Sequence, residues 1–267
     1  MAILLLKLFI TPILISTATL AGRRWGPVVN GLVVGLPLTT GPISFILANE
    51  YGLAFATKAA AGNLAGQVSM CVFCLTYSLV AQKSSWKVSA PLAVTAFLLT
   101  TFALNQVSWQ LLPAFIILAL AIALVASIVP QRRVAVAVTA PPKWDLPARI
   151  GIATTFVIVL TTVANVLGPQ LSGLISTFPI FGVVFAVFTH SQQGPKAAAN
   201  LLRGIVLGSV AYACFFLTIG LCLIPVGMAL TYVLAPLVAL LVSGFFYFVT
   251  KREGRRLANN PDHAGNL

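Results

Sequence analysis

Long apolar runs, separated by short polar stretches, follow one another along the chain. Each run approaches or exceeds the roughly 20 residues that an α-helix needs to cross the hydrocarbon core of a bilayer. The pattern therefore predicts an all-α polytopic membrane protein with nine transmembrane helices. The nine predicted segments are 3–21, 27–48, 54–81, 88–104, 110–129, 149–166, 170–190, 198–224 and 228–249.

Composition supports this class and excludes two others. Hydrophobic residues make up 59% of the 267 residues and charged residues 7%, and the mean hydropathy is +1.02. Soluble domains carry about 25% charged residues, because their surfaces face water. The composition excludes a soluble enzyme, and the high apolar content excludes a disordered chain.

The formal net charge of +12 predicts the orientation of the chain in the membrane. Of the 16 Lys and Arg residues, 14 fall near loops after odd-numbered segments or in the C-terminal tail, and only Lys7 and Lys58 fall on the other side. Positive charge marks the cytoplasmic side. We therefore expect an integral protein of the plasma (bacterial inner) membrane, with the N-terminus outside and the C-terminus cytoplasmic. The basic residues are scattered singly, so we expect no nucleic-acid partner.

The two halves of the chain match after a shift of 142 residues. Residues 26–66 contain ten Gly or Pro, and seven of them coincide with the identical residue in the other half. At usual frequencies of roughly 5–7% for each type, fewer than one coincidence would arise by chance. Among the matches, Pro37 pairs with Pro179 and Gly62 with Gly204.

This match predicts two inverted four-helix repeats joined by an extra helix. A shift by five membrane crossings reverses the direction of each helix, and such inverted repeats are typical of secondary transporters. A duplication that only enlarged a helical bundle is the alternative, and channels also contain inverted repeats. The predicted units are 1–108 (repeat 1), 109–148 (linking helix and basic loop), 149–250 (repeat 2) and 251–267 (polar tail).

The second and seventh segments are predicted to be broken helices. Both are rich in Gly and Pro, with Pro37 and Pro179 at matching places. Interruptions at corresponding positions of two repeats are typical of transporter binding sites, and a half-helix beginning at Pro37 would direct its positive end at the site. The predicted substrate-binding residues are Pro37, Thr39, Thr40, Ser44, Ser176, Thr177 and Pro179, with Asn63, Gln67 and Tyr212 as polar residues of the flanking helices. Each polar residue could instead bond within or between helices.

Ionisable residues are few inside the predicted segments. Glu50 and His190 are the candidates for proton coupling, since intramembrane acids and titrating histidines often mark ion paths. Glu50 could instead pair with Lys58 at the interface. Arg203 is expected to extend its charge to the inner surface. Because no Asp lies within a predicted segment, the substrate is expected to be a small polar or anionic solute rather than a cation.

The sequence indicates a secondary transporter that works by alternating access, not an enzyme. It contains none of the common catalytic or nucleotide-binding motifs, and no cofactor or metal site is expected. One alternative is a flippase for a lipid or lipid-linked precursor. Another is a membrane subunit of a larger complex that docks through the basic loop 130–149. The expected partners are the solute and membrane lipids, with homo-oligomerisation left open.

Overall fold

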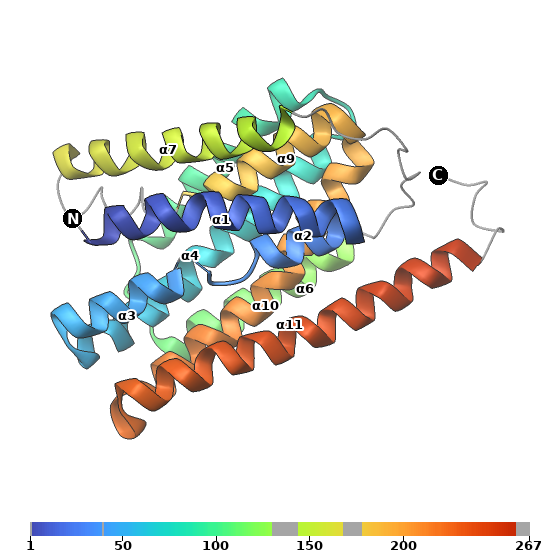
Figure 1. Cartoon of the computed structure of the whole chain (residues 1–267). Coiled ribbons are helices and arrows are strands. Elements are labelled where there is room, and N and C mark those ends of the chain that lie inside the picture. The colour runs from blue at the N-terminus through green and yellow to red at the C-terminus, as the bar shows by residue number, and fades with distance from the viewer. Residues whose placement is uncertain (1, 39, 130–143, 168–177, 260–267) are drawn as a thin grey trace.

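The computed structural model describes residues 2–38, 40–129, 144–167 and 178–259. Within these ranges the chain is helical and contains no strand. Figure 1 shows the helices arranged as an elongated bundle. They are α1 (Ala2–Trp25), α2 (Pro27–Val34), α3 (Thr40–Tyr51), α4 (Leu53–Val80), α5 (Trp86–Leu104), α6 (Leu111–Ile128), α7 (Asp145–Leu167), α9 (Ile180–Gln193), α10 (Pro195–Val226) and α11 (Met228–Asn259).

The protein is a helical integral membrane protein. Among the described residues, α4, α5, α6, α10 and the Met228–Val249 part of α11 are long and apolar enough to cross a membrane. Large apolar side chains cover the outside of the bundle, as at Leu99, Leu120 and Leu241, which are 60% or more exposed. Such a surface suits lipid rather than water. Nine membrane crossings and their inverted arrangement stay a prediction.

Helices α4 and α10 occupy the interior, and the other helices pack around them. Helix α4 contacts α5 and α6, whereas α10 contacts α2, α6, α9 and α11. Helix α1 packs on α2 and α7, which lie alongside it in Figure 1. Helix α10 therefore positions α2 and α9, and these two helices in turn hold α1 and α7.

Glycines allow α2 and α10 to touch through their backbones. A Cβ atom added to Gly204 would overlap the carbonyl oxygen of Val28, and one added to Gly31 would overlap that of Leu201. At Gly208 an added Cβ would lie 2.7 Å from the Leu32 carbonyl oxygen. Small residues at this spacing are what permits such an approach. This contact fixes α2, and with it the chain that follows Val34.

Several helix ends recur at an interval of 142 residues. Gly52 precedes α4 and Gly194 precedes α10, with φ of +87° and +86°. Glycine adopts this conformation without the Cβ clash that other residues meet, so both turns depend on it. The corresponding ends are Trp25 and Leu167, Tyr51 and Gln193, Leu53 and Pro195, and Trp86 and Met228.

The structure differs from the expectations at two helix ends. The half-helix expected to begin at Pro37 begins at Thr40, and Leu38 lies in a turn before it. At the other end of the chain, α11 continues past Lys251 to Asn259, inside the segment expected to be a polar tail. Charged residues favour helix formation as long as no Gly or Pro cluster interrupts them, and 251–259 contains one glycine.

Candidate functional site

The second predicted segment is interrupted between α2 and α3. Helix α2 ends at Val34 and α3 begins at Thr40. The buried Pro37 lies in this gap and has no backbone N–H to continue the helical bonding. Its carbonyl accepts the first hydrogen bond of α3, from the Gly41 N–H at 2.8 Å. Thr39 lies outside the described residues.

Helix α9 begins directly after the matching proline. Pro179 directly precedes the first residue of α9, and its carbonyl accepts a hydrogen bond from the Val183 N–H at 2.9 Å. Each proline carbonyl thus accepts a hydrogen bond from the N–H four residues later, but Pro37 lies three residues before α3 and Pro179 one residue before α9. Ser176 and Thr177 lie outside the described residues, so only the second half of this segment is described.

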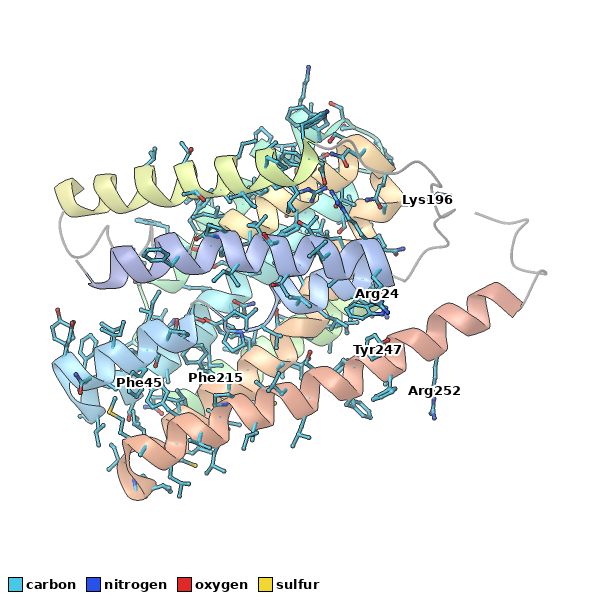
Figure 2. The ribbon with its side chains drawn as sticks, in the orientation of Figure 1. Arg24, Phe45, Lys196, Phe215, Tyr247 and Arg252 are labelled. Carbon is cyan, nitrogen blue, oxygen red and sulfur yellow. The ribbon has the colours of Figure 1, made fainter. Side chains whose placement is uncertain are left out.

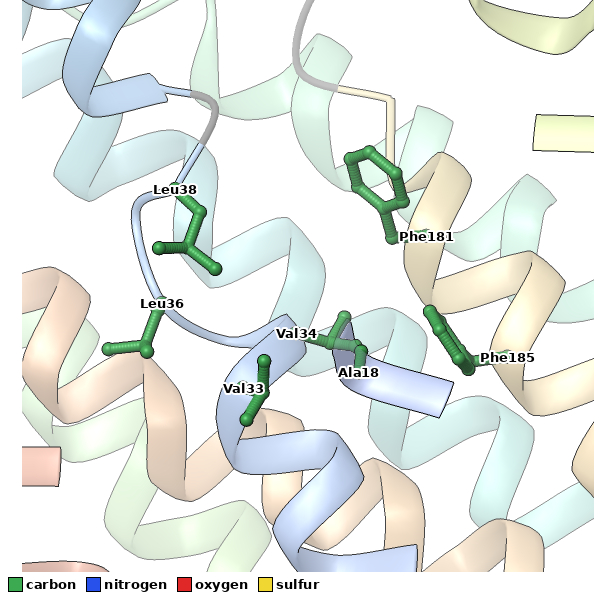
Figure 3. Close-up of a pocket in the computed structure, with 7 residues that line it drawn as sticks. All are labelled: Ala18, Val33, Val34, Leu36, Leu38, Phe181 and Phe185. Atoms are coloured by element: carbon green, nitrogen blue, oxygen red, sulfur yellow. The ribbon is translucent and has the colours of Figure 1, made fainter. Parts of the chain in front are cut away.

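A pocket lies between the interrupted chain and α9. Its cavity volume is about 30 Å³, and it is partly open to the outside. Figure 3 shows side chains from both sides lining it, with Phe181 and Phe185 on α9 facing residues of α1, α2 and the interruption. The complete lining is Ala18, Val33, Val34, Leu36, Leu38, Phe181 and Phe185. The pocket at the predicted site is therefore lined by apolar side chains.

The predicted polar residues of α4 and α10 bond to one another. The Gln67 side chain donates to the Ser209 hydroxyl at 2.8 Å, and the Tyr212 hydroxyl donates to the Asn63 amide oxygen at 3.3 Å. The Asn63 amide nitrogen also donates to the Ala59 carbonyl of its own helix at 3.0 Å. In this conformation these residues join α4 and α10. Such bonding between helices was the alternative to a role in substrate binding. Gln67 and Ser209 are separated by 142 residues.

The hydroxyl groups of α3 are directed at neighbouring helices. The buried Ser44 forms a 2.8 Å hydrogen bond with the Tyr232 hydroxyl on α11, whose ring meets Phe45 edge-on. The Thr40 hydroxyl lies near Tyr212, outside hydrogen-bond geometry. Thr40, Ser44 and Tyr232 do not line the pocket.

The two coupling candidates have different surroundings. Glu50 is exposed, and it forms no ion pair with Lys58, which is also exposed. His190 is buried, with 8% of its surface exposed, and its Nδ1 lies 3.3 Å from the Tyr77 hydroxyl. Tyr77 is fully buried on α4. The structure brings neither candidate into the lining of the pocket.

A buried ionic network, which sequence reasoning missed, joins three helices at one end of the bundle. Asp145 at the start of α7 accepts hydrogen bonds from Arg23 at 3.1 Å, Arg149 at 2.9 Å and Gln192 at 2.7 Å. Asp145 and Arg149 are only 1% and 3% exposed. These four residues are called the Asp145 network. The Asp–Arg spacing of four residues is a helix-pair signal that could have indicated part of it.

The network keeps its carboxylate charged. Burial raises the pKa of the Asp145 carboxyl, but hydrogen bonds from Gln192 and Arg149, and a further one from Arg23, outweigh burial. The pKa of Asp145 therefore lies below its ordinary value. The Arg149 guanidinium lies 5.5 Å and 4.8 Å from the ring centres of Phe185 and Phe188, within cation–π distance. Phe185 belongs to the pocket lining, so the network directly adjoins the pocket.

Arg203, which is expected to extend its charge to the inner surface, is half-buried. Its guanidinium donates to the carbonyls of Ala126 and Val129 at the C-terminal end of α6. Those carbonyls lack partners within their own helix, and the helix dipole makes this end negative. Arg203 therefore fixes α6 against α10 at this end.

Comparisons with known proteins give no further assignment. No family model, curated protein or solved structure matches the chain. In the part of the chain that the structure describes, no three His, Cys, Asp or Glu side chains gather to form a metal site. The candidate site is thus the pocket at the interruption, with the Asp145 network beside it.

Proposed function

We propose that the protein is a secondary carrier that moves a small solute by alternating access through the pocket between the interrupted segment and α9. The observation that supports this proposal is the pocket itself. It lies beside the break that follows α2 and beside α9, which begins directly after Pro179. Non-helical backbone is tolerated at membrane depth only where it is buried in protein or lines a cavity. Broken helices that share a cavity are the usual construction of a carrier site.

An inverted repeat of nine membrane crossings is part of the proposal. The helix ends that recur at 142 residues support it, as do the contacts of α1 with α7 and of α4 with α10, which join corresponding helices. Two copies related by a twofold axis should meet through such self-corresponding pairs. Alternating access follows naturally, because exchanging the conformations of the two halves turns one open state into the other.

The proposed orientation places the N-terminus outside and the C-terminus in the cytoplasm. Figure 2 shows the basic residues Arg24, Lys196 and Arg252 at the same end of the bundle, far from Phe45. This is the end that carries the Asp145 network. Positive charge concentrated at one end supports its assignment as the cytoplasmic end.

The proposed substrate has a polar or anionic group and an apolar portion. The apolar portion would contact Phe181, Phe185 and the leucines of the interruption. The polar group would meet the N-terminal turn of α3, where the helix dipole is positive. The absence of an acidic side chain from the lining supports the preference against cations.

A cysteine-labelling experiment tests alternating access without knowledge of the substrate. The four native cysteines are replaced by alanine, Leu38→Cys is introduced, and sealed vesicles of both orientations are treated with a membrane-impermeant maleimide. A carrier should allow labelling at position 38 from either face. Leu99→Cys on the lipid-exposed surface of α5 is the matched control and should remain unlabelled by the impermeant reagent. Labelling at position 38 from one face only, or from neither, overturns the proposal.

A flippase for a lipid or lipid-linked precursor is the second candidate. The apolar lining of the pocket favours it, because an acyl chain could rest there. The basic residues at one end would attract anionic headgroups. Purified protein in liposomes containing a fluorescent anionic phospholipid separates the two functions, because only a flippase accelerates movement of the lipid between leaflets.

A further inference from the structure

The pocket is bounded by two helices that are tied together a short distance away. Ala18 on α1 and Phe185 on α9 both line it. Towards the end of the bundle, the same helices present Arg23 and Gln192 to one carboxylate, that of Asp145 on α7. The Asp145 network thus joins the two sides of the pocket through a third helix.

The network also supports one wall of the pocket. The ring of Phe185 faces the pocket, and the Arg149 guanidinium lies 5.5 Å from the centre of that ring. Asp145 holds Arg149 from the other side through a 2.9 Å hydrogen bond. An aromatic side chain, a guanidinium and a carboxylate therefore follow one another from the pocket toward the basic end.

We propose that the Asp145 network is the cytoplasmic gate of this pocket. While Arg23 and Gln192 both hold Asp145, α1 and α9 stay together and the pocket is closed to the basic end. Loss of these bonds would let α1 and α9 separate and would expose Phe185 to the cytoplasm. This proposal rests on the proposed carrier function, since it assigns a role in the same site.

Charged partners suit a gate better than an apolar seal. An ion pair that opens into water exchanges its hydrogen bonds for hydration, whereas an apolar contact that opens exposes hydrophobic surface. Arg23 is already partly hydrated, because 36% of its side chain is exposed. Asp145 and Arg149 are almost fully buried, so water reaches them only if the helices part.

Labelling of the Leu38→Cys protein from the cytoplasmic face tests the gate. Arg23→Gln removes one charge from the network, and Arg24→Gln removes the same charge from the neighbouring residue, which contacts the Trp25 ring instead. We expect Arg23→Gln to raise the rate of cytoplasmic labelling about three- to tenfold and to lower labelling from the outside. Arg24→Gln should leave both rates within about twofold of the parent protein.

A second variant guards against a folding defect. Asp145→Asn should increase cytoplasmic labelling more than Arg23→Gln does, because Arg23→Gln leaves the hydrogen bond between Asp145 and Arg149 in place. Equal rates for the Arg23→Gln and Arg24→Gln proteins overturn the gate. An equal rise from both faces also overturns it, because general loosening of the fold would produce that result. If the parent Leu38→Cys protein is labelled from both faces and the network variants change nothing, the carrier proposal stands and the gate alone fails.

Discussion

Helices α4 and α10 carry a glycine at corresponding positions, yet the two glycines have different surroundings. Gly204 of α10 lies against the backbone of α2, where an added Cβ would overlap the Val28 carbonyl. Gly62 of α4, 142 residues earlier, is exposed, and an added Cβ would meet nothing within 4 Å. The glycine spacing predicts that a close approach can occur. It does not predict which of two equivalent helices makes one.

The polar residues at the ends of α3 and α9 repeat this contrast. Gln192 on α9 donates to the buried Asp145, whereas Glu50, its counterpart on α3, is exposed. The turns that follow them are alike, because Gly52 and Gly194 have nearly the same backbone conformation. The two halves therefore share their backbone turns and differ in side-chain contacts. In a carrier such a difference is expected, since each conformation closes one half-pathway and opens the other.

The largest expected difference in the free energy of unfolding is between variants of Gly204 and Gly62. Gly204→Ala should lower the free energy of unfolding by about 3 kcal/mol, because its Cβ cannot be accommodated without moving α2. Gly62→Ala should raise the free energy by up to about 1 kcal/mol, because alanine is favoured over glycine in helices. Titration with SDS in mixed micelles measures both. Effects of the same sign and size would show that the two glycines have equivalent surroundings after all.

Substitution of Gly52 and of Gly194, the glycines that precede α4 and α10, should lower the stability by similar amounts. Gly52→Ala and Gly194→Ala place a side chain in a backbone conformation nearly restricted to glycine, at a cost of about 2 kcal/mol each. An added Cβ meets no atom within 4 Å at either position, so packing makes no contribution. The same SDS titration should give values for the two variants that agree within about 0.5 kcal/mol. A large gap between them would mean that the turns are not equivalent.

A smaller contrast is expected between Gln192 and Glu50. Gln192→Ala removes a hydrogen bond to a buried carboxylate and should lower the free energy of unfolding by about 1.5 kcal/mol. Glu50→Ala, at an exposed position, should change it by less than about 0.5 kcal/mol. Gln192→Glu is a further check, because a second carboxylate beside Asp145 would be repelled. An unchanged stability in that variant would argue against the observed contact.

The smallest effect is a pH dependence that belongs to Asp145. Its pKa is lower in the folded protein than in the unfolded chain, so its contribution to stability is complete above the unfolded pKa of about 3.9. The contribution is lost as the pH falls through the lower, folded pKa. Unfolding measured between pH 6 and pH 3 should show this loss, and Asp145→Asn should show less of it.

The helical segments and the interruption at Pro37 were predictable from the sequence, whereas most side-chain contacts of the candidate site were not. Apolar runs located helical segments correctly because lipid requires backbone groups to be bonded within each helix. Pro37 indicated the interruption, because proline removes a backbone donor. The helix after it begins three residues later, at Thr40, a shift that depends on how the chain turns in three dimensions.

Side-chain partners were not predictable from one sequence. Asn63, Gln67 and Tyr212 were predicted as polar residues of the helices that flank the interrupted segments, and their mutual bonding depends on the rotation of α4 against α10. Asp145 was treated as a loop residue because it precedes the apolar run of α7. Its burial arises from α1 and α9, whose polar ends reach it from distant parts of the sequence.

The hydrogen bond between Gln67 and Ser209 has a consequence for the origin of the protein. If the halves descend from one gene, these two positions were once the same residue in two separate chains. On the proposed inverted repeat, that residue would have met its own copy at the centre of an antiparallel homodimer. A shared residue at such a point must bond to itself, as two glutamines or two serines can do. Fusion of two such genes would have released that restriction, so that a larger and a smaller side chain could pair at positions 67 and 209.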